Sequence, residues 1–130
     1  RIELTCVADG RRLGFMEDAD IYALFGNILD NAIEAVEQLE DGERRLISLN
    51  VRARDHFLIV SEENYYGGEL VMEQGLPMTT KSDKRFHGFG MQSIRMLTEK
   101  YGGDLRLRAS GGIYRLSILF PVSEKLEENG

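Results

Sequence analysis

A helical repeat of apolar residues in the first third of the chain constrains its fold most strongly. Apolar side chains recur at spacings of three and four and define one face of a helix: Ile21, Leu24, Phe25, Ile28, Ala32, Ala35, Val36 and Leu39. A polar stripe lies on the flank of that face and comprises Asn27, Asn31, Glu34 and Gln38. Side chains three or four positions apart on a helix are neighbours, so these polar groups should converge.

Two asparagines in the middle of a helix require an explanation, because the Asn side chain competes for backbone hydrogen bonds and disfavours helix. The carboxamide oxygens of Asn27 and Asn31 are hard, neutral ligands that suit Mg²⁺, an ion that usually shares substrate phosphates. A solvated helix flank would account for the same stripe. The two asparagines alone therefore leave a magnesium site and an exposed surface as alternatives.

Alternating apolar and polar residues predict five strands, at 2–6, 47–53, 57–61, 105–109 and 114–120. The first strand should be half-buried, and the second and third should form a hairpin through Arg54-Asp55. The apolar face of a second helix is formed by Met91, Ile94, Leu97 and Tyr101. Strands whose helices gather on one face predict a two-layer α/β sandwich.

Turn and cap residues support these boundaries. Asp18 or Asp20 can cap the first helix, which should run to about Leu39. Gly102-Gly103 should end the second helix as a C-terminal glycine cap. Gly111-Gly112 is a strong hairpin turn between the last two strands.

Composition excludes several classes of protein. The 130 residues are the size of one domain, and the formal net charge of -6 argues against nucleic-acid binding, which needs a basic surface. No run of about 18 apolar residues is present, so no contact with a membrane is predicted for this segment. Cys6 is the only cysteine, which excludes an intrachain disulfide. We expect one domain at 1–122 and a polar tail at 123–130, in a piece of a longer protein, because the sequence opens on a strand without a start methionine.

The periodicity disappears between Glu63 and Gly88. A loop of this length inside a compact domain is usually functional and is often a lid, which we place at about 64–88. Its end carries Lys81, Lys84 and Arg85, a local positive cluster in an acidic chain. A phosphate ligand would balance these cations, and a solvated loop surface is the alternative.

Two glycines stand at the expected start of the second helix, in His87-Gly88-Phe89-Gly90-Met91. Glycine lets the backbone approach a ligand closely, and the free N–H groups and dipole of a helix start favour an anion. Ser93 could add a hydroxyl group. Most Gly-x-Gly pairs are ordinary turns, and this one matches neither the Rossmann fingerprint nor the P-loop.

The order of these features resembles the GHKL ATP-binding superfamily, and within it the catalytic domain of sensor histidine kinases of the quorum-sensing, peptide-responsive type. Residues 27–32 (NILDNA) match the N box, residues 87–91 (HGFGM) match the G2 box, and residues 75–81 (GLPMTTK) fit the lid segment before it. The resemblance covers nearly the whole chain. It implies a Bergerat-type ATP-binding fold, with a mixed, mostly antiparallel sheet covered on one face by helices.

The resemblance implies a role for each matching residue. Asn31 would be the Mg²⁺ ligand, and Asn27, one turn earlier, would support the metal or the phosphates. Lys81 would contact the phosphates from the lid and complete the catalytic set with these two asparagines. Gly88 and Gly90 would line the triphosphate through backbone N–H groups. The other ATP-binding residues that we expect are Glu34, Asn64, Arg85, His87, Phe89, Met91 and Ser93.

The chain departs from the family in its G1 box, whose pattern is Asp-x-Gly-x-Gly and whose Asp accepts from the adenine amino group. No Asp is available after the third strand, and Asn64 is our candidate for this place, with Glu63 as the competing assignment. A carboxamide oxygen can still accept that hydrogen bond, although without charge assistance. Asn64 as a simple turn residue is the remaining alternative.

Members of the superfamily that hydrolyse ATP carry a Glu four residues before the metal-binding Asn. Asn27 stands there in this chain, and an amide cannot serve as a general base at neutral pH. The resemblance therefore implies Mg²⁺-dependent transfer of the ATP γ-phosphoryl group to a histidine on an upstream dimerisation domain. It also implies a response regulator as partner and a cytoplasmic position in a membrane-anchored sensor. The alternatives are a protein-serine kinase of the anti-sigma-factor type and a nucleotide-binding regulatory module without catalysis.

Overall fold

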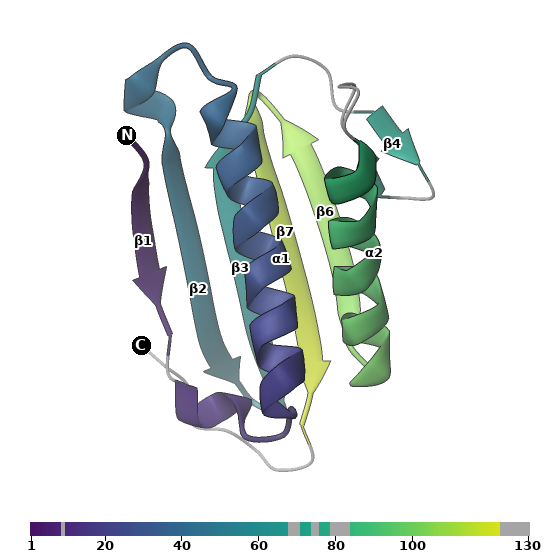
Figure 1. Cartoon of the computed structure of the whole chain (residues 1–130). Helices are drawn as coiled ribbons and strands as arrows, with labels where there is room; N and C mark the ends of the chain where they lie inside the picture. The colour runs from purple at the N-terminus through teal and green to yellow at the C-terminus, as the bar shows by residue number, and fades with distance from the viewer. Residues whose placement is uncertain (9, 68–70, 74–75, 79–83, 123–130) are drawn as a thin grey trace.

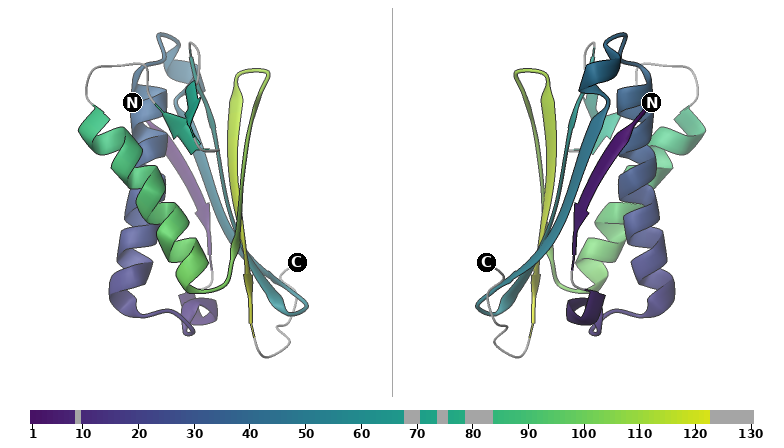
Figure 2. Two further views of the ribbon diagram at one scale, coloured as in Figure 1. Left: turned by 90° about the vertical axis from the view of Figure 1, so that its right-hand side faces the viewer. Right: turned by 90° about the vertical axis from the view of Figure 1, so that its left-hand side faces the viewer.

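Both long helices lie on the same face of a five-stranded sheet, as the computed structural model in Figure 1 shows. The structure describes residues 1–8, 10–67, 71–73, 76–78 and 84–122, with side chains over 1–8, 12–67 and 90–122. Figure 2 shows the sheet edge-on as one layer and the helices as the other. The predicted two-layer sandwich is therefore confirmed. The expected tail at 123–130 lies outside the described residues.

The main sheet has the strand order β1-β2-β3-β7-β6. Its strands are β1 (Glu3–Val7), β2 (Leu46–Arg54), β3 (Phe57–Tyr65), β7 (Ile113–Pro121) and β6 (Asp104–Ser110). Only β1 and β2 pair in parallel, so the sheet is mixed and mostly antiparallel, as expected. β3 is longer than its apolar pattern alone predicted, because residues 62–65 continue the antiparallel ladder with β7.

The two tight turns use residues in the left-handed backbone region. Gly111 and Gly112 have φ angles of 62° and 80°, which confirms the predicted glycine hairpin between β6 and β7. Asp55, in the turn between β2 and β3, is the one non-glycine residue with positive φ, at 52°, within the described part of the chain. Asp tolerates this region because its short polar side chain can bond locally.

A second, two-stranded sheet lies within the segment that we predicted as a loop. It consists of β4 (Val71–Glu73) and β5 (Leu76–Met78), which pair antiparallel. Three-residue strands give too little alternation for a pattern of period two, so the sequence did not reveal them.

The core forms where alternate residues of the sheet meet the apolar stripe of α1 (Asp18–Glu37). On α1 the buried residues are Leu24, Ile28, Ala32 and Val36. Leu39, just beyond the helix, is buried as well, so five of the eight residues predicted for this face are buried. On β2 they are Ile47, Leu49, Val51 and Ala53. Complete burial of a large aliphatic side chain stabilises the fold by about 1.5–3 kcal/mol, so this interface fixes where α1 lies on the sheet.

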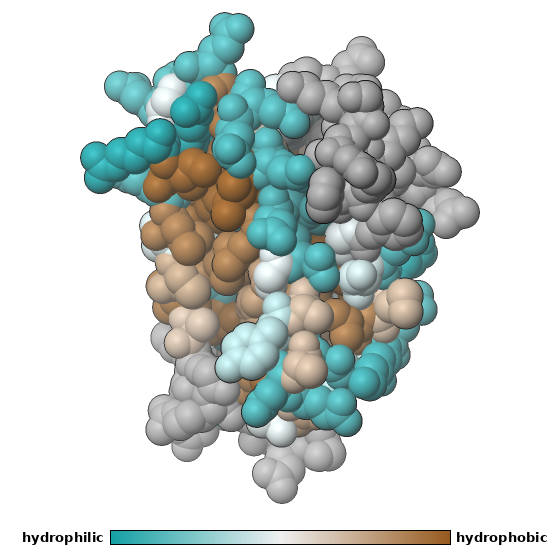
Figure 3. Space-filling view, viewed as in Figure 1, coloured by the Kyte–Doolittle hydropathy of each residue, from teal (hydrophilic) through white to brown (hydrophobic). Residues whose placement is uncertain are grey.

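The prediction that the first strand is half-buried was wrong, because all five residues of β1 are exposed. β1 is an edge strand beside β2, and Figure 1 shows neither helix above it. Leu4 and Val7 are 51% and 60% exposed. Figure 3 shows hydrophobic residues at the surface on this side of the molecule. Alternation in the sequence marks a strand here but does not say whether another layer covers it.

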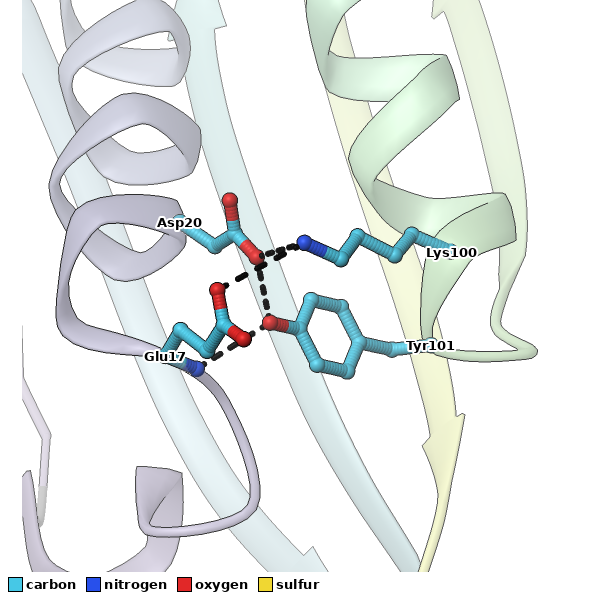
Figure 4. A network of polar contacts seen from close by, with 4 residues as sticks. All are labelled: Glu17, Asp20, Lys100 and Tyr101. Carbon is cyan, nitrogen blue, oxygen red and sulfur yellow. Dashed lines mark hydrogen bonds and ion pairs between the residues drawn. The ribbon is translucent and has the colours of Figure 1, made fainter.

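The start of α1 is held by the end of the second helix rather than by its own cap. Glu17 is the N-cap residue and makes no side-chain cap, so the predicted capping by Asp18 or Asp20 was wrong. Instead the Glu17 N–H donates to the Tyr101 hydroxyl at 3.0 Å, and that hydroxyl donates to the Asp20 carboxylate (Figure 4). Lys100 also donates to Asp20, at 2.7 Å. The bonds from Lys100 and Tyr101 lower the pKa of Asp20 below its usual value.

The second helix, α2 (Lys84–Lys100), ends as predicted at Gly102-Gly103. Gly102 has a φ of 69°, and the Gly103 N–H donates to the Thr98 carbonyl at 2.8 Å. Short 3₁₀ turns at Gly10–Leu13 and Gly42–Arg44 connect the remaining elements. Neither α1 nor α2 offers the uninterrupted apolar length that crossing a bilayer requires, within the part of the chain that the structure describes.

Candidate nucleotide-binding site

The asparagines of α1 face a glycine of α2. A Cβ atom placed on Gly90 would lie 3.0 Å from Asn31 Oδ1 and 3.6 Å from Asn27 Oδ1. A contact as short as the first would require the Asn31 amide to move by a few tenths of an ångström, so glycine at residue 90 leaves this amide the space that it occupies. The structure thus brings together residues that are 59 and 63 positions apart in the sequence and that we had assigned to one site.

The orientation of the two amide groups is fixed by their NH₂ ends. Asn31 Nδ2 donates to the Met91 sulfur at 2.9 Å, and Asn27 Nδ2 donates to the Ala23 carbonyl at 2.8 Å. Each amide therefore keeps its oxygen for another partner, and both oxygens lie on the side of Gly90. Two neutral oxygens beside one residue are a donor set that fits Mg²⁺, which completes its shell with phosphate and water oxygens.

The described residues hold no group of three or more His, Cys, Asp or Glu side chains that could bind a metal. A cation here would thus depend on the two amides and on oxygens from a ligand. Such a weak protein donor set suits an ion that arrives with a polyphosphate.

The predicted start of the second helix was wrong. α2 begins at Lys84, so Gly88 and Gly90 lie inside the helix rather than ahead of it. Interior N–H groups bond within the helix, and the free ones belong to its first four residues. The role of Gly88 and Gly90 in lining a triphosphate stays a prediction, and only the position of the helix start is corrected. Each added residue gains one bond as a helix propagates, which offsets the cost of about 1 kcal/mol for a helical glycine.

Several expected site residues lie outside what the structure describes. Lys81 is outside the described residues, and so is most of the segment 75–81. The side chains of Arg85, His87 and Phe89 are likewise outside the described set, although their backbone belongs to α2.

The remaining predicted residues of the helices are Met91 and Ser93 on α2 and Glu34 on α1. Met91 is buried, with 2% of its surface exposed, and it holds Asn31 through its sulfur. Ser93 is half-buried on α2 and Glu34 is half-buried on α1, one turn beyond Asn31. Met91 thus supports the site as a core residue.

The structure separates the two candidates for the adenine contact. Asn64 is buried on the inner face of β3, where its Nδ2 donates to the Tyr65 carbonyl at 2.8 Å. Glu63 points to the opposite face and forms an ion pair with Arg115. Only Asn64 therefore faces the helix layer. Its oxygen has no hydrogen-bond partner among the described residues.

The sequence analysis missed a buried carboxyl group two residues before Asn64. Glu62 is 1% exposed, and burial, with a smaller contribution from the charge of Glu63, raises its pKa to about 8. The apolar alternation of Leu58 and Val60 would have placed Glu62 on the inner face, had we extended the strand beyond Ser61. The end of β3 thus presents two buried polar residues, Glu62 and Asn64, on the inner face of the sheet.

Comparison with solved structures shows the same fold in histidine kinases. The histidine kinase domain of the blue-light activated kinase from Erythrobacter litoralis EL346 matches with a TM-score of 0.65 and 19% identity, over 94% of this chain and 55% of that chain. The catalytic domain of the histidine kinase ThkA matches with a TM-score of 0.63 and 22% identity, over 92% of this chain and 78% of that one. This chain thus spans about half the length of the first of these structures.

A third similar structure is the histidine kinase AdeS from Acinetobacter baumannii, with a TM-score of 0.58, 15% identity and coverage of 94% of this chain and 54% of that chain. At such identities the likeness shows the fold alone. No curated protein matches the chain. The family model described as the GHKL domain matches residues 16–121, which span both helices and the strands β2 to β7. On this match the chain belongs to the GHKL family.

Proposed function

We propose that this domain binds Mg-ATP and transfers the γ-phosphoryl group to a histidine on a separate dimerisation domain, in a two-component signalling protein. The observation that carries the proposal is the convergence of the Asn27 and Asn31 oxygens on Gly90. The likeness to histidine kinases supports the choice of acceptor. A response regulator would then be the downstream partner.

We assign the phosphates of the nucleotide to one end of the site and the base to the other. Asn31, with Asn27 behind it, would hold Mg²⁺ on the phosphates, and Asn64 would accept from the amino group of the base. Lys81 and Arg85 would contact phosphate oxygens from the lid. The metal would supply neutralisation of the phosphate charge, which is the main requirement of phosphoryl transfer.

The chemistry of residue 27 favours transfer over hydrolysis. The Asn27 amide donates to the Ala23 carbonyl and cannot take a proton from water at neutral pH. An attacking water would thus find no base at residue 27, and Glu34, one turn beyond Asn31, is the alternative base on α1. A histidine acceptor brings its own nucleophilic nitrogen. We therefore expect slow hydrolysis of ATP by the isolated domain.

Calorimetric titration with ATP and Mg²⁺ tests the binding half of the proposal. We expect binding by the native domain and at least tenfold weaker binding by Asn31→Ala. Asp30→Ala is the matched control, because Asp30 is the exposed neighbour on the same helix. Equal affinities for Asn31→Ala and the control would contradict the site.

Phosphotransfer is tested in the full-length protein that carries an acceptor histidine, with acid-labile, base-stable phosphate as the readout. A phosphohistidine that is lost in Asn31→Ala supports the kinase. Binding without any phosphoprotein would favour a regulatory nucleotide module. Acid-stable phosphate on a serine would favour a protein-serine kinase.

A further inference from the structure

Three buried polar atoms have no hydrogen-bond partner among the described residues. They lie where the end of β3 pairs with the start of β7. They are Glu62 Oε2, Asn64 Oδ1 and the Tyr114 hydroxyl. The exposed fractions of these residues are 1%, 3% and 9%. Buried polar groups in native proteins almost always have a hydrogen-bond partner, so three buried polar atoms without one in the same region require an explanation.

The three atoms belong to one patch. Asn64 and Tyr114 are direct partners across the β3–β7 ladder, and Glu62 lies two residues earlier on the same face of β3. The neighbours of Glu62 across the sheet are Leu49 on β2 and Leu116 on β7. The stripe of α1 that covers the sheet is apolar as well. Tyr114 is therefore the one titratable group facing Glu62 among the buried residues that the structure describes.

The hydrogen-bonding character of the patch follows from its surroundings. The Asn64 NH₂ group is engaged by the Tyr65 carbonyl, so its free oxygen can only accept. Glu62 is largely protonated at neutral pH because burial raises its pKa to about 8, so its carboxyl group can donate. Burial also raises the pKa of Tyr114, so the hydroxyl keeps its proton.

An acceptor beside a donor matches the edge of adenine, whose amino group donates and whose neighbouring ring nitrogen accepts. We propose that Glu62 contacts the base of the nucleotide, donating a hydrogen bond from its neutral carboxyl group to the adenine ring nitrogen next to the amino group that Asn64 binds. Guanine presents a carbonyl and an N–H at these two places, so its carbonyl would oppose the Asn64 oxygen and Glu62 could meet the N–H only by turning its own carbonyl oxygen toward it. The inference rests on the proposed function and names the residue that selects the base.

The alternative is that Glu62 is a core residue that merely tolerates burial. Substitutions of Glu62 separate the two explanations. Glu62→Gln keeps a donor and an acceptor but cannot ionise, whereas Glu62→Met has similar length and cannot donate. Thermal unfolding of both variants at pH 7 establishes that they are folded before any binding is measured.

Calorimetric titration with Mg-ATP and Mg-GTP at pH 7 and pH 9 is the test. In the native domain we expect about tenfold weaker ATP binding at pH 9, because a group with a pKa of about 8 is then one-tenth protonated. Glu62→Gln should bind within about threefold of the native domain at pH 7 and lose most of the decrease at pH 9. Any effect of the nucleotide's own ionisation on the affinity is the same for this variant and the native domain, so the comparison between the two proteins removes it.

Glu62→Met should bind ATP about tenfold more weakly at pH 7 and should have a smaller preference for ATP over GTP, because only the Asn64 contact to the base remains. Native-like ATP affinity in Glu62→Met, or the same pH profile in the native domain and Glu62→Gln, would overturn the inference. If Asn31→Ala weakens ATP binding while the Glu62 variants do not, the role of Glu62 fails and the proposed function stands. If the native domain does not bind ATP, both fail.

Discussion

Glu62 should make the stability of the domain depend on pH. Its pKa is about 8 in the folded state against an ordinary value of 4.5, because the carboxyl group is buried beside Glu63. Below pH 4.5 the group is protonated in both states and costs nothing. Between pH 4.5 and 8 only the folded state keeps the proton, so the free energy of unfolding falls by about 1.36 kcal/mol per pH unit. Above pH 8 both states are ionised and the loss stops.

The size of the effect follows from these two values. Relative to pH 4.5, the destabilisation should be on the order of 3 kcal/mol at pH 7 and about 5 kcal/mol at pH 8. These figures are upper limits, because a buried site relaxes when it becomes charged. They are large against a typical total stability of about 5–15 kcal/mol.

Urea unfolding of the native domain and Glu62→Gln, at several pH values from 4.5 to 9, measures this directly. Glu62→Gln cannot ionise, so the difference between the two proteins removes the pH dependence of every other group. The stability of the variant relative to the native domain should rise by about 3 kcal/mol between pH 4.5 and 7. Two curves that stay parallel over this range would refute the claim that Glu62 is protonated in the fold.

Three further predictions concern the helices. Gly90→Ala should weaken Mg-ATP binding at least tenfold by displacing the asparagine oxygens, whereas the control Gly26→Ala, which has open space around it, should leave binding unchanged and stabilise α1 by about 0.5–1 kcal/mol. Tyr101→Phe should lower the thermal midpoint by a few degrees near pH 7. That difference should shrink as the pH falls through the lowered pKa of Asp20, since protonation weakens the same network; an undiminished difference would contradict the assignment. Gly102→Ala should destabilise the domain by about 1 kcal/mol in urea unfolding, because residue 102 has a φ of 69°, and no loss would contradict its role as a cap.

The sandwich could be predicted from the sequence because its signals are local and periodic. The apolar stripe of α1 and the alternation along β2 and β3 each specify an element and its buried face. The glycine pairs at 102–103 and 111–112 specify a cap and a turn through positive φ angles. Such features need no knowledge of the partner layer.

The features of the fold that we predicted wrongly depend on residues that are distant in the sequence. Burial of β1 depends on whether a helix lies above it, which the strand itself does not encode. The start of α1 is held by Tyr101, which is 84 residues away from Glu17 in the sequence. The start of α2 at Lys84 depends on whether helical bonds extend through two glycines, and local propensity alone argued against this.

For the candidate site, the sequence identified the asparagines but not the geometry that joins them. The closeness of Asn31 to Gly90 follows from the packing of α1 against α2, which no spacing rule gives. Glu62 was missed because a carboxyl group on an inner face contradicts the pattern used to find strands. Places where a sequence breaks its own pattern are where functional groups tend to lie.

The central claim is that one nucleotide binds at the place where the two asparagines of α1 meet α2 at Gly90. A crystal structure with a non-hydrolysable ATP analogue and Mn²⁺, in which anomalous scattering locates the metal, tests it most directly. We expect the metal within about 2.3 Å of Asn31 Oδ1, with the base against Asn64 and Glu62. A metal remote from Asn31, or a base bound away from the end of β3, would contradict the account.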